Sequence, residues 1–116
     1  MSVYVQVFEA LAGLAGGRVY PILADEGVST PYIVVQRVGG APVNFLTGEQ
    51  PEQKHHRIQV SVWATTAVEA EEVAEQVEQA MRLAVALQPE VLGGAVDTYD
   101  ELTTYRGTRQ EFSLFF

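Results

Sequence analysis

The spacing of apolar residues changes abruptly within the segment RIQVSVWATTAVEAEEVAEQVEQAMRLAV, from Arg57 to Val85. In its first part, apolar and polar residues alternate, which is typical of a strand with one face on a core. The residues on the core-facing side are Ile58, Val60, Val62 and Ala64. Gln59, Ser61 and Trp63 lie on the opposite side. The pattern therefore predicts a strand over this part of the chain.

The second part of the segment has the spacing of a helix. Thr66 followed by Glu69 forms a capping box, in which each side chain satisfies a backbone N–H that the first helical turn leaves open. An apolar stripe at intervals of three and four follows: Ala70, Val73, Ala74, Val77, Ala80, Met81 and Ala84. Pro89 is expected to end this helix. The two threonines therefore mark a strand that turns into an amphipathic helix and folds back on the same sheet.

The N-terminal residues predict a shorter helix over residues 3–17, which the glycines Gly16 and Gly17 are expected to end. Its inward-facing residues would be Val7, Phe8, Leu11 and Leu14. RVYPIL then indicates a short extended segment that Pro21 confines to an edge or an end of a sheet.

Three further strands are predicted. PYIVVQRV has apolar residues on both faces, since Ile33 and Val35 lie opposite Tyr32, Val34 and Val38. After the second helix, GGAVDTY and GTRQEFSLFF indicate two strands around a polar turn, and the last strand places Phe112, Leu114 and Phe116 on one face. Between PYIVVQRV and the central strand lies a long irregular loop over residues 39–56, which we expect to be mobile in the isolated protein and ordered on binding a tail partner.

This order of elements predicts an α+β fold in which an antiparallel β-sheet carries both helices on one face. A chain of 116 residues, 47% of them hydrophobic, has the size of one domain, so we expect a single domain over residues 1–116. The N-terminus has neither the basic region of a signal peptide nor an uninterrupted apolar span. Without cysteine, a disulfide framework is excluded and a cytoplasmic origin is expected.

Charge narrows the possible partners. The net charge is −8, and only seven residues are Lys or Arg. The acidic residues concentrate on the second helix: Glu69, Glu71, Glu72, Glu75 and Glu78. Phosphate backbones and anionic membranes are bound by clustered basic residues. We therefore expect neither specific nucleic-acid binding nor membrane binding.

Candidate chemistry is sparse. His55 and His56 are adjacent, so on an extended backbone they point to opposite sides, and a solvated loop end explains them better than a metal site. Asp97, Asp100 and Glu101 are explained better as solvated acids than as a catalytic pair. The sequence has no nucleophile elbow, phosphate-binding loop or dinucleotide fingerprint. We expect no catalytic residue, no cofactor and no metal.

Three segments form a specific pattern: GRVYP at residues 17–21, PYIVVQR at residues 31–37, and QVSVWA leading into EAEEVAEQV. In these segments, and over nearly its whole length, the chain resembles the small tail-completion proteins of long-tailed bacteriophages and prophages. The resemblance implies a fold similar to that of phage tail terminators and a non-enzymatic role in the virion. The protein would assemble in the host cytoplasm, complete or cap the tail and join it to the head connector.

The resemblance also implies the partners, namely further copies in a homo-oligomeric ring, a hexamer in similar families, and the tail tube or the head connector. A small adaptor or regulatory module that binds a bacterial host protein is the alternative. An enzyme is the third class, but the sequence shows no convergent polar groups for it. Adjacent major tail protein and tape-measure genes would favour the tail role, whereas an isolated locus would favour the adaptor.

The strand faces suggest where contacts form. Trp63 and Phe115 are expected to point away from the helices, as are some of Tyr32, Val34 and Val38. Large aromatic residues on a second sheet face indicate a covering loop or a partner. Phe45 and Leu46 are among the few apolar residues of the long loop. The expected interface with subunits and tail partners therefore comprises Trp63, Phe115, Tyr32, Val34, Phe45 and Leu46.

Overall fold

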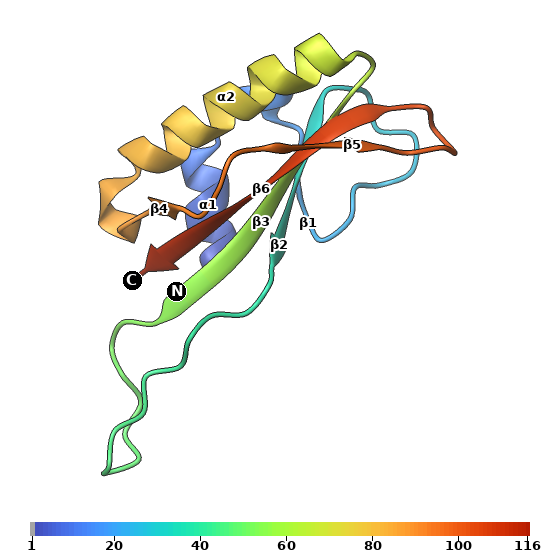
Figure 1. Cartoon of the computed structure of the whole chain (residues 1–116). Coiled ribbons are helices and arrows are strands. Elements are labelled where there is room, and N and C mark those ends of the chain that lie inside the picture. The colour runs from blue at the N-terminus through green and yellow to red at the C-terminus, as the bar shows by residue number, and fades with distance from the viewer. Residues whose placement is uncertain (1) are drawn as a thin grey trace.

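A computed structural model describes residues 2–116 and shows a twisted sheet with both α-helices packed on one side (Figure 1). The elements follow in the order α1 (Val3–Ala10), η1 (Leu14–Gly17), β1 (Val19–Pro21), β2 (Tyr32–Arg37), β3 (His55–Ala64), α2 (Ala67–Leu83), η2 (Val85–Leu87), β4 (Glu90–Val91), β5 (Val96–Tyr99) and β6 (Arg106–Phe115). The strand order is β1-β2-β3-β6-β4, with β5 also paired to β6. The α+β fold expected from the sequence is confirmed.

The two long strands β3 and β6 form the centre of the sheet and pair antiparallel over their full length, from His55 opposite Phe115 to Ala64 opposite Arg106. This register places the alternating apolar residues of both strands on one face. The fully buried ones are Ile58, Val60, Val62, Ala64, Phe112 and Leu114. Val3, Val7 and Leu11 of the N-terminal segment and the stripe of α2 cover that face and complete one core.

Helix α2 begins where the sequence predicts. The Glu69 N–H donates to the Thr66 hydroxyl at 3.2 Å, which satisfies one of the open groups of the first turn. The residues buried on the core side are Ala70, Val73, Ala74, Val77 and Met81. The predicted strand-to-helix unit is therefore confirmed.

Both helices end earlier than predicted. The first is a helix only to Ala10, because Gly13 takes a left-handed conformation at φ 86° before the short turn η1. The second ends at Leu83, because Ala84 leaves helical geometry and the turn η2 follows before Pro89. In each case the buried residue after the helix, Leu11 or Leu87, keeps the chain on the core.

One strand pair departs from the expected antiparallel arrangement. Edge strand β1 runs parallel to β2, with Val19 opposite Ile33 and Pro21 opposite Val35. The connection over residues 22–31 carries the chain back along the sheet, which a parallel pair requires. Pro21 lies in this edge strand, as the sequence predicts.

None of the helices within residues 2–116 has the length and apolar character needed to cross a membrane.

A polar contact also ties α2 to the sheet. Gln110 is only 5% exposed although it is polar. Its amide donates to the Glu78 carboxylate at 2.7 Å and to the Gly93 carbonyl at 2.9 Å. The hydrogen bond from Gln110 is the main cause that lowers the pKa of Glu78, and the hydrogen bond from Arg82 lowers it further. Alternation in GTRQEFSLFF places Gln110 on the core face, but nothing local in the sequence predicts its partner.

This lowered pKa predicts a pH-dependent contribution to stability. Because the pKa of Glu78 is lower in the folded state, its charge stabilises the fold above the ordinary pKa of a glutamate, and the stabilisation disappears as the pH falls through the folded pKa. Glu78→Gln should lower the free energy of unfolding at pH 7 by about 1 kcal/mol at most, because the side chain is partly exposed. The difference from wild type should vanish in acid.

Denaturant unfolding of both proteins at several pH values measures this effect. Glu75→Gln, on the exposed face of the same helix, is the control and should change little. A difference between wild type and Glu78→Gln that stays constant from neutral to acidic pH would contradict the assigned role of the charge.

Candidate interaction surfaces

The face of the sheet opposite the helices carries a cluster of aromatic residues at one end. Tyr32 lies opposite Trp63 in the β2–β3 pair. The ring of Tyr32 meets those of Tyr20 and Tyr105 edge to face, each at 6.4 Å between centroids. We call the group Tyr20, Tyr32, Val34, Trp63 and Tyr105 the aromatic end. All five side chains are half-buried in the isolated chain.

Trp63 fits against the sheet because its partner across the β3–β6 pair is Gly107. A Cβ atom at position 107 would lie 2.7 Å from Trp63 Cε3 and 2.5 Å from the Val62 carbonyl oxygen. Both separations are far below van der Waals contact. The indole ring therefore takes the space that any other residue at position 107 would occupy.

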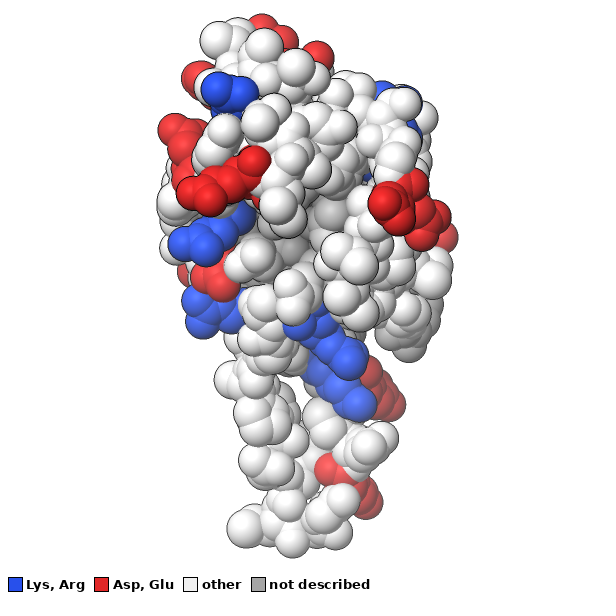
Figure 2. All heavy atoms as spheres, turned by 90° about the vertical axis from the view of Figure 1, so that its right-hand side faces the viewer, with Lys and Arg blue, Asp and Glu red and all other residues white. Residues whose placement is uncertain are grey.

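An apolar hollow of about 420 Å³ opens beside the aromatic end. The segment after β1 and the turn before β6 form its walls. Its apolar lining includes Ile22, Leu23, Val28, Tyr32, Val34 and Trp63. Figure 2 looks onto this end and shows uncharged side chains around a hollow, with acidic side chains on both flanks and basic side chains among them on the left and below. The hollow is thus an apolar surface with a charged border.

The acidic border is built partly by the turn that closes the hollow. Asp100 accepts from the Leu102 N–H at 3.1 Å and from the Thr103 hydroxyl at 3.0 Å, so its carboxylate stabilises the turn. Burial, followed by the neighbouring Tyr105 and Asp100, raises the pKa of Tyr32. Tyr32 therefore stays a neutral phenol at physiological pH.

The loop between β2 and β3 forms an arm, residues 38–54, that extends beyond the body of the molecule (Figure 1). Its base is tied to the sheet. The backbone carbonyl of Arg57 accepts from the Val38 N–H at 2.8 Å, and the Arg57 N–H donates to the Gly39 carbonyl at 2.9 Å. Lys54 and Phe116 exchange two further backbone hydrogen bonds. Gly40 packs so closely on the backbone of His55 that a side chain there would collide with the His55 carbonyl oxygen. The base of the arm is therefore fixed in direction.

The far end of the arm is apolar and exposed. Leu46 is 110% exposed and Phe45 is 48% exposed, next to a turn in which Gly48 donates to the Phe45 carbonyl at 3.1 Å. Val43 is also exposed. We call Val43, Phe45 and Leu46 the arm tip. These side chains lie outside the core cluster.

The histidines lie in strand β3 rather than at a loop end, which corrects the prediction from sequence. His55 Nδ1 accepts from the Ala41 N–H at 2.6 Å, so in a neutral ring Nε2 carries the proton and donates to Ser113 at 2.6 Å. This pair of bonds fixes the arm to β6. The site needs both strands and was not predictable from the sequence.

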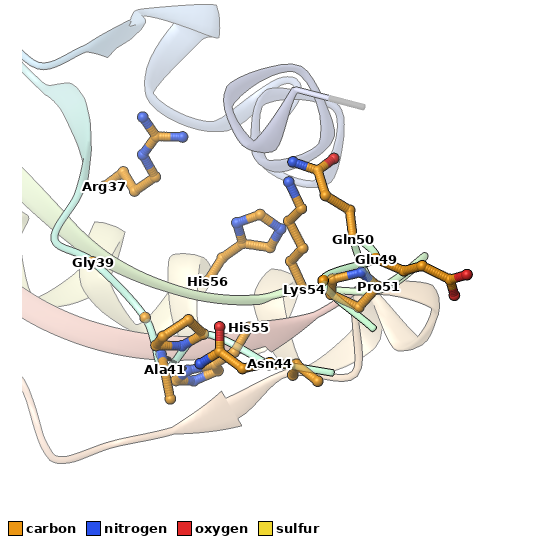
Figure 3. Close-up of a pocket in the computed structure, with 14 residues that line it drawn as sticks. Arg37, Gly39, Ala41, Asn44, Glu49, Gln50, Pro51, Lys54, His55 and His56 are labelled. Atoms are coloured by element: carbon orange, nitrogen blue, oxygen red, sulfur yellow. Dashed lines mark hydrogen bonds between the residues drawn. The ribbon is translucent and has the colours of Figure 1, made fainter. Parts of the chain in front are cut away.

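His56 points to the opposite side of β3 from His55, together with Arg37 and Lys54 (Figure 3). Its ring lies 4.6 Å from that of Phe116. Burial, followed by the nearby Arg37, lowers the pKa of His56. The hollow of about 500 Å³ at the arm base is lined by Arg37, Lys54, Glu49 and both histidines. Within residues 2–116, no group of three His, Asp or Glu side chains is placed to hold a metal ion.

The structure brings together three of the six interface residues expected from sequence. Trp63, Tyr32 and Val34 meet at the aromatic end. Phe115 lies at the other end of the same face, opposite His55, and Phe45 and Leu46 lie on the arm. Ile22, Leu23 and Tyr105 were missed, because only the closure of two loops over the sheet brings them to Trp63.

Comparisons with known proteins agree on the kind of molecule. The family described as "Tail completion protein gp17" has a model that matches residues 6–113. A chain in the solved structure "Virion of native gene transfer agent (GTA) particle" has the same fold, with a TM-score of 0.69 at 17% identity over 98% of this chain and 93% of that chain. No curated protein gives a significant sequence match.

Because Trp63 packs so closely on Gly107, adding a single methyl group at position 107 is expected to destabilise the fold. Gly107→Ala should lower the free energy of unfolding by about 1–3 kcal/mol, because the new Cβ overpacks the space under the indole. Denaturant unfolding followed by tryptophan fluorescence measures both the stability and the environment of Trp63. Gly94→Ala, where a Cβ would meet nothing within 4 Å, is the matched control and should change the stability little. Equal effects of the two substitutions would contradict the assigned fit.

Removing most of the exposed arm is a much larger change, but it is expected to affect the stability little. Deleting the residues between Pro42 and Gln53 should leave the thermal midpoint of the isolated protein nearly unchanged, because the deleted segment contributes no residue to the buried core. Thermal unfolding followed by circular dichroism checks this. A large drop in the midpoint would instead make the arm part of the folded core.

Proposed function

This chain belongs to the tail completion protein gp17 family, and on that premise we propose that it completes the phage tail as a homo-oligomeric ring and joins it to the head connector. The observation that carries the proposal is the family match over residues 6–113, which begins within α1 and ends within β6 and so includes every element between them. Membership makes the protein a structural component of the virion tail.

The structural neighbour supports the same place of action. It belongs to a virion particle, and the shared fold covers 98% of this chain. The tail role is thereby favoured over an adaptor that binds a bacterial host protein. The tail tube and the head connector are the proposed partners, and assembly would take place in the host cytoplasm before the particle is complete.

We further propose a non-catalytic role, because two of the polar groups that were weighed as candidates, Asp100 and His55, serve the fold. Asp100 stabilises its own turn. His55 joins the arm to β6. Each of these side chains has its hydrogen bonds within the chain, where it acts as a positioning element.

Ring formation needs two surfaces on each subunit, and the chain offers two separate apolar ones. The aromatic end lies at one end of the sheet, and the arm tip lies beyond the other. Exposed apolar groups of this size mark contacts with partners. A hexamer is the stoichiometry proposed by analogy with similar families, and the passage through an acidic ring would not retain DNA by charge.

Deleting the gene for this chain from the genome that encodes the particle tests the proposal directly. Without the gene, electron microscopy should show heads and tails that fail to join, with tails of uncontrolled length or unfinished ends. Wild-type protein supplied in trans should restore complete particles.

The variant without the arm should fold but fail to restore particles, whereas Gly94→Ala is the control that should restore them. Complete, infectious particles in the absence of the gene would show that the protein has no role in finishing the tail.

A further inference from the structure

The chain carries an apolar projection and an apolar depression that do not meet each other. The projection is the arm tip, in which Leu46 is 110% exposed. The depression is the hollow beside Trp63, whose wall residue Leu23 is 79% exposed. Each surface is costly to leave in water, because burial of apolar area is the main favourable term in protein association.

The arm cannot fill the hollow of its own chain. Trp63 and His55 lie near opposite ends of β3, and at about 3.3 Å per residue the strand separates them by about 26 Å. The arm continues away from the His55 end, and the longest dimension of the molecule is 51 Å (Figure 1). An arm tip that fills the hollow must therefore belong to another copy.

Charge decides how two copies can meet. Asp25, Glu26 and Asp100 border the hollow, and its described lining includes neither Lys nor Arg. Two hollows placed face to face would bring these carboxylates together, which is unfavourable. Residues 41–48, by contrast, contain no charged side chain. Figure 2 shows this end of the arm largely free of colour. An uncharged apolar tip fits between acidic borders, whereas a second hollow does not.

We propose that the arm tip of one copy docks in the apolar hollow of the next copy, with Leu46 and Phe45 against Trp63, Tyr32 and Leu23. The proposal rests on the self-association that belongs to the proposed function. Tryptophan and tyrosine in a partly enclosed pocket are the usual anchors of such contacts.

This contact joins different surfaces of the two copies, so it propagates from head to tail. Such an interface produces a ring when the rotation closes and a filament when it does not. The fixed base of the arm, held by Gly40 and His55, would set the angle between neighbours.

Three single substitutions at exposed positions test the contact. Leu46→Asp in the tip and Leu23→Asp in the hollow should each weaken self-association about tenfold or more, because each buries a carboxylate in an apolar contact. Val68→Asp, at a 65% exposed position on α2, is the matched control and should associate like wild type. Light scattering across a wide concentration range measures association, and circular dichroism verifies the fold.

Mixing the two deficient variants separates head-to-tail docking from other arrangements. Leu46→Asp keeps an intact hollow, and Leu23→Asp keeps an intact tip, so together they can form one productive contact. The expected product is a one-to-one heterodimer that grows no further. Association of Leu46→Asp alone at wild-type strength would overturn the proposal.

Disulfide trapping detects the contact even when it is weak. The chain has no cysteine, so a double variant Leu46→Cys, Leu23→Cys carries only the two thiols at issue. Treatment with oxidised glutathione should produce a ladder of linked copies on a non-reducing gel, whereas each single variant should stop at dimers. The absence of a ladder overturns the docking.

The two proposals fail separately. Particles that require the gene, combined with no ladder, would retain tail completion and remove the docking. A ladder, combined with complete particles in the absence of the gene, would retain the docking and remove tail completion.

Discussion

The pairing of β3 with β6 is the interaction on which the rest of the structure depends. Both strands alternate in polarity, and their register places Ile58 opposite Phe112 and Val60 opposite Gln110 on the face beneath the helices. A slip by one residue would turn every one of these side chains to the other face. The pairing therefore fixes at once which side α2 covers and which side remains open.

Two consequences of this register shape the open face. Trp63 comes opposite Gly107, so the bulky indole packs closely against the sheet where no side chain opposes it. At the other end, His55 comes opposite Phe115 and close to Ser113, which holds the base of the arm. The same strand pair thus creates the aromatic end and directs the arm away from it, so that the two apolar surfaces cannot satisfy each other within one chain.

The helix-covered side and the open side of the sheet also differ in their charged and polar residues. The acidic face of α2 lies on the covered side of the sheet, and the buried Gln110 links that helix to β6 through Glu78. The open side carries the acidic border of the hollow and an uncharged arm tip. For a member of the tail completion family, this arrangement separates what holds the fold together from what is available to neighbours.

The sequence by itself determined the elements whose signals are local. Alternation over a few residues defined β3 and β6, the Thr66 cap and the apolar stripe defined α2, and Pro21 marked an edge strand. The parallel pairing of β1, the short strand β4, the early ends of both helices and the partner of Gln110 were decided by the tertiary structure. So was the meeting of Tyr32 and Trp63 with Leu23, and the separation of Phe115 from them. The reason is physical: periodicity and capping depend on neighbours within a turn or two, whereas pairing and loop closure depend on contacts between segments that are far apart in the chain.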